Sequence, residues 1–287
     1  MDIFLMKPKI DFAFKEIMED EKARVGFLSA VMGLNPKDIK ETRILNTNLS
    51  KKHGDDKQGI LDVHLLMNDN LEINIEIQLA ELKVWADRSL FYLAKMFTDQ
   101  ISPGDSYRVF KKCVSISILD FKLFDKAEGF YSRFHIREDT CGFLYTDKME
   151  FHVIELPKLP LGISEGSPEI ELWAKFINAE RKEEFDMLAE RNPYIESAYE
   201  RLQIISQDSG KRMEYEAREK AIRDYNEGLL EAEARGEARG EKRGEKRGEQ
   251  RVNKLITLLL RDGRYEDLKQ SAEDTGFQHQ LMKEYDI

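Results

Sequence analysis

One carboxylate and two amides alternate with apolar residues in the stretch INIEIQLAE, residues 73–81. Strict alternation predicts a strand with one apolar face and one polar face, and the polar face here carries Asn74, Glu76 and Gln78. Polar strand faces are common at protein surfaces. The row therefore has chemical meaning only through the residues that lie opposite it.

The stretch GILDVHLLM, residues 59–67, predicts the strand that lies opposite, joined through the turn residues Asn68-Asp69-Asn70. A hairpin centred on Asp69 pairs residues whose numbers sum to 138, so Asp62 faces Glu76. Opposed Cβ atoms in an antiparallel pair are about 4.5–5.5 Å apart. His64 lies on the same face as this acidic pair.

Two ionised carboxylates about 5 Å apart repel each other by on the order of 3 kcal/mol at an effective dielectric constant of about 20. Solvent screening, a neighbouring Lys or Arg, or a bound divalent cation could each offset this repulsion. A cation would also keep coordination positions for water and phosphate. The residues alone leave the three alternatives open, and a register shift of one residue would separate the pair.

The elements predicted around the hairpin have the order α-β-β-β-α-β, which indicates an α/β (α+β) fold. The pattern predicts, in order, a helix over 11–32 ended by Gly33, a strand over 39–49, the two hairpin strands, a helix over 85–101 and a strand over 113–121. A further strand is predicted at 149–155. We expect a domain over residues 1–160.

The rest of the chain is predicted to be helical and rich in charged residues. We expect a helical extension over 161–232, an RGEx repeat of period four over 233–251 and a short helical unit over 252–287. The repeat is either a flexible charged linker, because each interior Gly costs a helix about 1 kcal/mol, or a helix with separate Gly, Glu and Arg stripes. We expect this C-terminal helical arm to make the protein a homo-oligomer.

Composition narrows the class of protein. The formal net charge is −10, which argues against a protein that binds nucleic acid over its whole surface but leaves a local site possible. No apolar run is long enough to span a membrane and no cleaved leader is recognisable, so we expect no membrane association and a cytoplasmic protein. Cys113 and Cys141 are too few for a disulfide framework and lack zinc-ligand spacing.

Five motifs together resemble a known family. DFAFKEI near the start, LDV ahead of NIEIQ, RSLFYLAK from Arg88, and IELPK at 154–158 are similar to those of the recombination-promoting nuclease (Rpn)/putative transposase family. That family belongs to the PD-(D/E)xK nuclease superfamily. The resemblance covers about residues 7–160 and implies a restriction-endonuclease-like αβββαβ core with a metal-dependent DNA endonuclease activity, associated with recombination or mobile elements.

The resemblance also implies roles for three residues. Asp62 matches the motif aspartate and Glu76 the acidic residue of (D/E)xK, so this pair would hold Mg²⁺ or another divalent cation. Gln78 stands where many superfamily members have Lys, although this family commonly has Gln; it would help to position the attacking water. An amide carries no charge, so we expect lower activity, and a catalytically weak or inactive nucleic-acid-binding or assembly protein is the alternative.

Five further residues are candidates for the site. Asp11 is either a third metal-side carboxylate or an N-cap, and Lys57 either supplies the missing positive charge or is a solvated loop lysine. Arg88 and Tyr92, four residues apart on one helical face, are candidates for phosphate contacts or for packing. His64, without a second histidine at ligand spacing, is more often structural.

Overall fold

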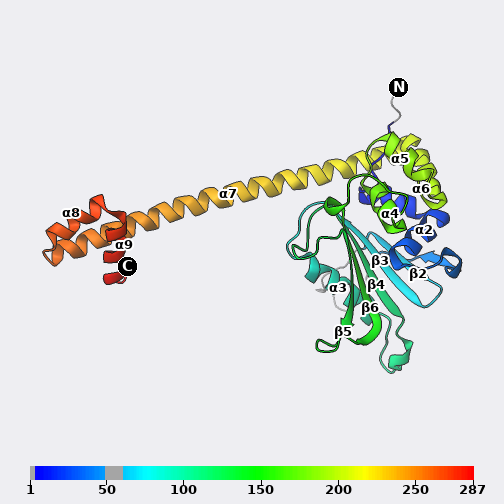
Figure 1. The fold of residues 1–287 in the computed structure, drawn as a ribbon, viewed down its shortest axis with the longest axis horizontal. Helices are drawn as coiled ribbons and strands as arrows, with labels where there is room; N and C mark the ends of the chain where they lie inside the picture. The colour runs from blue at the N-terminus through cyan, green and yellow to red at the C-terminus, as the bar shows by residue number, and fades with distance from the viewer. Residues whose placement is uncertain (1–3, 49–60) are drawn as a thin grey trace. The chain divides into compact units, whose positions relative to one another are not determined.

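A mixed β-sheet forms the centre of the N-terminal unit, Met1–Ala221, in the computed structural model, which describes residues 4–48 and 61–287 (Figure 1). Within the described residues the strand order is β1-β2-β3-β4-β6-β5, and the pairs β3/β4 and β4/β6 are parallel. The strands are β1 (Thr42–Ile44), β2 (Val63–Met67), β3 (Leu71–Gln78), β4 (Lys112–Leu119), β5 (Tyr131–Arg137) and β6 (Leu144–Glu155). Short 3₁₀ helices η1 (Pro36–Asp38), η2 (Tyr107–Val109) and η3 (Leu156–Lys158) lie in the connections.

Helix α3 (Trp85–Thr98) covers one face of the sheet. Its apolar residues recur at helical spacing, and Tyr92 and Leu93 pack with Leu61 and with Cys113 of β4. Trp85, the first residue of α3, packs against Leu119 of β4 and is almost completely buried. This packing fixes α3 over the sheet face that carries the polar row of β3.

Five helices lie against the other face and one another: α1 (Asp11–Met18), α2 (Glu21–Met32), α4 (Glu169–Asn178), α5 (Lys182–Ala189) and α6 (Pro193–Gln207). Their core is a run of edge-to-face aromatic contacts from Phe14 through Phe27, Trp173 and Phe176 to Phe185. The helices that follow residue 160 therefore share a core with the first two helices. The domain boundary expected at residue 160 stays a prediction.

The predicted element order is present, with three differences. The helix expected over 11–32 is two helices, because the Asp20 carboxylate accepts a hydrogen bond from the Ala23 amide (2.7 Å) and starts α2 anew. The strand expected over 39–49 is reduced to the three residues of β1. Strand β5 was not predicted, since most of its residues are partly exposed and their pattern does not alternate strictly.

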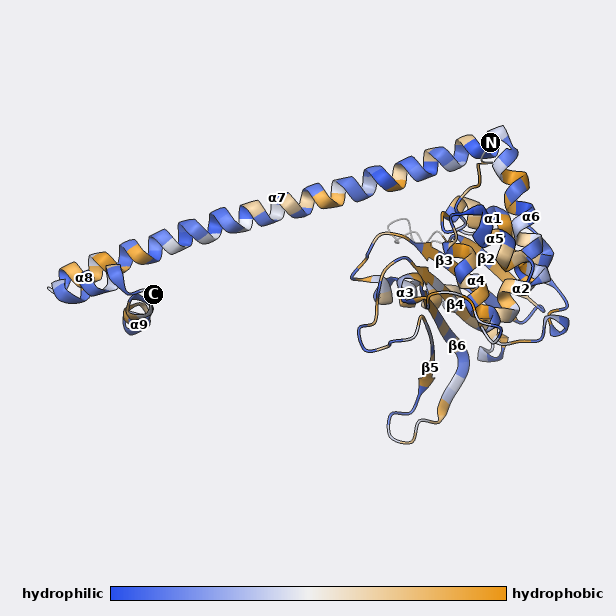
Figure 2. Cartoon of the chain, turned by 45° about the horizontal axis from the view of Figure 1, so that its top comes forward, coloured by the Kyte–Doolittle hydropathy of each residue, from blue (hydrophilic) through white to orange (hydrophobic). Residues whose placement is uncertain are grey.

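The C-terminal unit, Ile222–Ile287, contains the end of α7 (Ser209–Arg261) with α8 (Tyr265–Glu273) and α9 (Thr275–Glu284). The repeat over 233–251 is helical, and α7 is mainly hydrophilic along its length (Figure 2). A small core holds the last three helical segments together, made of Leu255, Leu259, Leu281 and Met282. Among the described helices, none combines the length and the apolar character that crossing a bilayer requires.

Candidate active site

The hairpin of β2 and β3 has the predicted register. Val63 pairs with Ile75 and His64 with Asn74, so Asp62, directly before β2, stands opposite Glu76. The turn has positive φ at Asn68 (50°) and Asp69 (59°), a conformation that Asn and Asp tolerate better than most residues. The Asn68 side-chain oxygen also accepts a hydrogen bond from the Lys40 amide (2.8 Å), which ties the turn to the chain ahead of β1.

Main-chain hydrogen bonds hold both carboxylates of the acidic pair. The Asp62 amide donates to Oε1 of Glu76 (3.2 Å), and the Ile77 amide donates to Oδ2 of Asp62 (2.9 Å). Glu76 is buried to 3% exposure between β2 and β4, where Ser117 is its neighbour in register. The two side chains are therefore fixed in position, as metal ligands and general bases must be.

Burial changes the acidity of the pair. It raises the pKa of Asp62 to about 6, and burial together with the charge of Asp62 raises the pKa of Glu76 to about 8. The raised pKa values of both carboxyls therefore favour a metal-free pair that keeps a proton near neutral pH. This proton offsets the repulsion between the two carboxylates. It is a fourth possibility beside the solvent screening, basic neighbour and divalent cation considered from the sequence.

Arg88 lies beside the acidic pair. Its Nη2 is 3.9 Å from Oε2 of Glu76, its Nε donates to the Tyr92 hydroxyl (3.1 Å), and its guanidinium lies over the rings of Trp85 and Tyr92. The structure thus brings together Arg88 and Tyr92, as their spacing suggested. Because Arg88 is 38% exposed, its attraction for Glu76 is partly screened by solvent.

Gln78 ends β3 on the same face as Glu76. Its side-chain nitrogen donates to the Ala80 carbonyl (2.9 Å), and this bond orients the amide. His64 is farther from the pair: its Nδ1 lies 2.9 Å from the Asn46 carbonyl, and its Nε2 is 4.0 Å from Glu72. Lys57, the other candidate near the hairpin, lies outside the described residues.

Asp11 is the first residue of α1, and the preceding Ile10 occupies the N-cap position without a side-chain hydrogen bond. The N-cap alternative for Asp11 is therefore wrong. Instead, Nε of Arg218, in α7, donates to both carboxylate oxygens of Asp11 at 2.8 and 2.7 Å. Arg218 is not among the residues predicted for the site, because it lies beyond residues 7–160, which carry the family motifs.

A pocket of about 530 Å³ lies where α1, the start of β2 and α7 meet. It is lined by Asp11, Phe12, Lys15, Thr47, Leu61, Asp62, Glu214, Ala217, Arg218 and Ala221. Asp62 is thus both a member of the acidic pair and part of the wall of an open pocket. A ligand in this pocket would reach Asp62 directly.

The donor set fits a hard divalent cation. Within the described chain no group of three or more His, Cys, Asp and Glu side chains is arranged to hold a metal ion. Mg²⁺, however, is usually bound by one or two carboxylates and keeps several water molecules. The two fixed carboxylates, one of which (Asp62) lines the pocket, meet that requirement.

A second buried carboxylate, Glu150 of β6, has a different environment. Lys112 contacts it at 2.5 Å, His152 at 3.0 Å and His135 at 3.4 Å, and Arg133 also pairs with it. This carboxylate is fully buried and surrounded by basic side chains. It is a neutralised structural group rather than an open acidic site.

The IELPK motif has a structural role. Oε1 of Glu155 accepts hydrogen bonds from the amides of Leu123 (2.6 Å) and Phe124 (3.1 Å). Lys158 donates to Oε2 of Glu155 (2.8 Å) and to the carbonyls of Phe124 (2.6 Å) and Ala127 (2.7 Å). This motif therefore fixes the loop after β4 and does not supply the lysine missing at Gln78.

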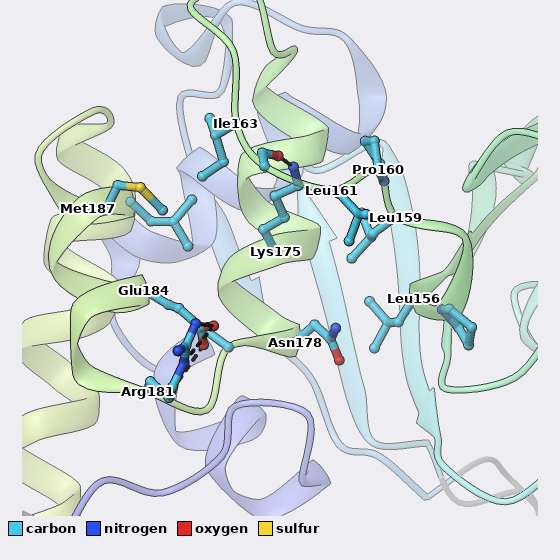
Figure 3. A pocket seen from close by; sticks show the side chains of 14 residues that line it. Leu156, Leu159, Pro160, Leu161, Ile163, Lys175, Asn178, Arg181, Glu184 and Met187 are labelled. Carbon is cyan, nitrogen blue, oxygen red and sulfur yellow. Dashed lines mark hydrogen bonds and ion pairs between the residues drawn. The ribbon is translucent and has the colours of Figure 1, made fainter.

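A second cavity, of about 520 Å³, lies between the segment after η3 and helices α4 and α5 (Figure 3). Apolar side chains line most of it, including Leu156, Pro160 and Met187, and the Arg181–Glu184 ion pair lies at one side (Figure 3). None of the acidic pair lines this cavity. We assign it no part in the chemistry.

Comparison with known protein families identifies the family of this chain. The sequence model of the PD-(D/E)XK nuclease family transposases matches residues 8–232, which include β1 to β6, α1 to α6 and the part of α7 that carries Arg218. The chain therefore belongs to this family. Searches of curated proteins and of solved structures found no significant match.

Proposed function

We propose that this member of the PD-(D/E)XK nuclease transposase family is a divalent-metal-dependent DNA endonuclease that hydrolyses phosphodiester bonds. The observation that carries the proposal is the acidic pair: Asp62 and Glu76 face each other and are held by main-chain amides, and Asp62 lines an open pocket. The family name adds an association with recombination or mobile elements.

In this proposal Asp62 and Glu76 hold Mg²⁺ or a similar cation. The bound cation would polarise the scissile phosphate and acidify a water molecule. Gln78, oriented by its bond to Ala80, helps to position that water through hydrogen bonds. Arg88 beside Glu76 offsets part of the negative charge that develops on the phosphate.

The alternative is a protein that binds or assembles on nucleic acid without cleaving it. The amide of Gln78 favours this alternative, because it supplies no charge where many related nucleases have Lys. A plasmid-nicking assay with Mg²⁺ and with EDTA separates the two. Nicking that requires Mg²⁺ supports the endonuclease; DNA binding without nicking, over a range of divalent cations, supports the alternative.

We further propose that α7 mediates self-association. Beyond the N-terminal unit it exposes Tyr225 together with Leu229 and Leu230, which lie four and five positions further along the helix. Exposed apolar side chains at such spacing are typical of helices that pack against a partner. The second copy of α7 is the partner that the repeat over 233–251 fits best, since its Glu and Arg stripes are complementary.

A further inference from the structure

The beginning of α7 places a cation, Arg218, in the wall of the pocket that Asp62 lines. Arg218, Glu214 and Ala217 form one wall of the pocket, and Asp62 and Asp11 lie on the other walls. These residues all belong to the N-terminal unit, which ends at Ala221. The arm helix is therefore part of the wall around the candidate active site.

The guanidinium of Arg218 is both fixed and available. Its bonds to Asp11 use Nε and Nη2, while an arginine has five N–H donors. The Arg218 side chain is 51% exposed, whereas the Asp11 side chain is 19% exposed. Asp11 thus holds the guanidinium in one orientation and leaves donors for a ligand in the pocket.

Among the described residues, few other cations lie at the site: Lys15 lines the pocket, and Arg88 lies beside Glu76. Gln78 is uncharged, and its amide nitrogen is bonded to a carbonyl. Arg88 lies over two aromatic rings and bonds to Tyr92. Arginine matches a phosphate with parallel N–H donors, and its charge stabilises the phosphate as negative charge develops.

We propose that Arg218 binds a phosphate of the DNA strand next to Asp62 and that Asp11 is the positioning residue that orients it. The proposal rests on the proposed endonuclease function and adds a substrate contact supplied by the arm helix. It also assigns Asp11 to Arg218 rather than to the metal.

Two measurements test this on the full-length protein: plasmid nicking in Mg²⁺, and the salt dependence of duplex DNA binding, measured by fluorescence anisotropy in EDTA. Arg218→Gln should lower the nicking rate by about 10- to 100-fold and reduce the slope of log Kd against log salt by about one. Arg218→Lys should keep the slope and recover part of the rate. Asp11→Asn should lower the rate less than Arg218→Gln and leave most of the slope.

Arg212→Gln is the matched control. Arg212 lies on the same helix, is 49% exposed and pairs with Glu216 at 2.8 Å, but it does not line the pocket. The control should change neither the nicking rate nor the salt slope. Circular dichroism would verify that each variant is folded.

Several outcomes would overturn the proposal while leaving the endonuclease function intact. Wild-type rate and slope in Arg218→Gln would exclude a phosphate contact, and a faster rate would instead make Arg218 a blocking residue. Equal losses of nicking rate and salt slope in Arg212→Gln would show that any positive charge on α7 has the same effect, so that Arg218 makes no specific contact. If the wild-type protein binds DNA but does not nick it, the endonuclease function fails, and the salt slope of Arg218→Gln alone tests the phosphate contact. If the wild-type protein neither binds nor nicks DNA, both the endonuclease function and the phosphate contact fail.

Discussion

A buried pair of facing carboxylates must keep a proton, gain a counter-ion or bind a cation. In this protein the proton and Arg88 share that role when metal is absent, because burial raises the pKa values of Asp62 and Glu76 and Arg88 is only 3.9 Å from Glu76. A divalent cation would have to displace the proton. The chemistry of the site is therefore coupled to pH before any substrate binds.

Replacing one carboxylate by its amide should abolish the reaction and preserve the fold. We expect Asp62→Asn and Glu76→Gln each to lower Mg²⁺-dependent nicking by at least about 100-fold, since each removes a charged ligand. Glu72→Gln is the matched control. Glu72 is also an acidic residue of β3, but it lies four residues before Glu76, where it is opposite Leu66 and near His64. Full nicking by purified Asp62→Asn protein would contradict the site assignment.

The pH dependence of stability follows from the raised pKa of Glu76. The folded pKa is about 8 and the ordinary value is 4.5, so the folded state binds this proton more tightly than the unfolded state. The metal-free protein should therefore lose stability as pH rises from about 5 to 8, relative to Glu76→Gln, which cannot ionise. We expect the Tm difference between the two proteins to change by at least a few kelvin over this range; a constant difference would show that Glu76 titrates normally.

Gln78→Lys restores the charged group that many related nucleases carry. We expect it to keep or raise the nicking rate, because an ammonium group beside the pair can stabilise negative charge on the phosphate. Parallel assays of the wild-type protein and of this variant at several Mg²⁺ concentrations measure the effect. A large loss would mean that the amide, held by Ala80, has a specific role.

At the scale of elements, the hairpin register could be predicted because two independent signals agreed. The turn residues Asn68 and Asp69 fix the centre, and the alternation of β3 fixes which residues share a face. The division of residues 11–32 into two helices at Asp20 was not predicted, because one N-cap residue within a continuous helical pattern of apolar residues only weakly indicates a new helix start. Arg218 could not be predicted, since it meets Asp11 across 207 residues of sequence and no local pattern reports such a contact.

The ion pair of the IELPK motif makes a separate prediction about stability. Glu155 is fully buried and the Lys158 side chain is 8% exposed, so Lys158→Met leaves a buried charge without its counter-ion. Breaking a buried pair in this way costs about 3–5 kcal/mol, of which the amides bonded to Glu155 should recover part. We expect a loss of about 3 kcal/mol in the free energy of unfolding, measured with urea.

The control for that prediction is Lys182→Met. Lys182 pairs with Asp186 at 2.6 Å on an exposed helix surface, where solvent screens the attraction and the pair adds little to stability. Equal losses of unfolding free energy in Lys158→Met and Lys182→Met would show that the buried ion pair contributes no more to stability than the exposed one. A folded Lys158→Met protein should still nick DNA, because this lysine is bonded to the loop after β4 and not to the acidic pair.

At the scale of the whole molecule, helix α7 has two parts with different roles. Its beginning carries Arg218, which we assign to phosphate binding, and its later part carries the glycine repeat, which is unfavourable in an isolated helix. Each glycine of the repeat costs the helix about 1 kcal/mol relative to Ala. A Cβ added at Gly236, Gly240, Gly244 or Gly248 would meet no atom of the same chain within 4 Å. Close packing inside one chain therefore does not account for these glycines, whereas close approach of a second helix would.

We therefore expect the full-length protein to self-associate, and a protein that ends after Ala221 to be monomeric. Ending there keeps Arg218 and the buried Tyr215, whose hydroxyl accepts a hydrogen bond from the Lys7 amide, so the N-terminal unit retains its contacts. Light scattering gives both masses, and equal monomeric masses would leave the arm as a charged spacer. Replacing the four glycines by Gln in the full-length protein separates the causes: each Gln favours a lone helix over Gly without adding an apolar stripe, so helix content by circular dichroism should rise. If the glycine stripe is the contact surface, the mass should fall toward that of a monomer at the same time, because the added side chains keep the two helices apart.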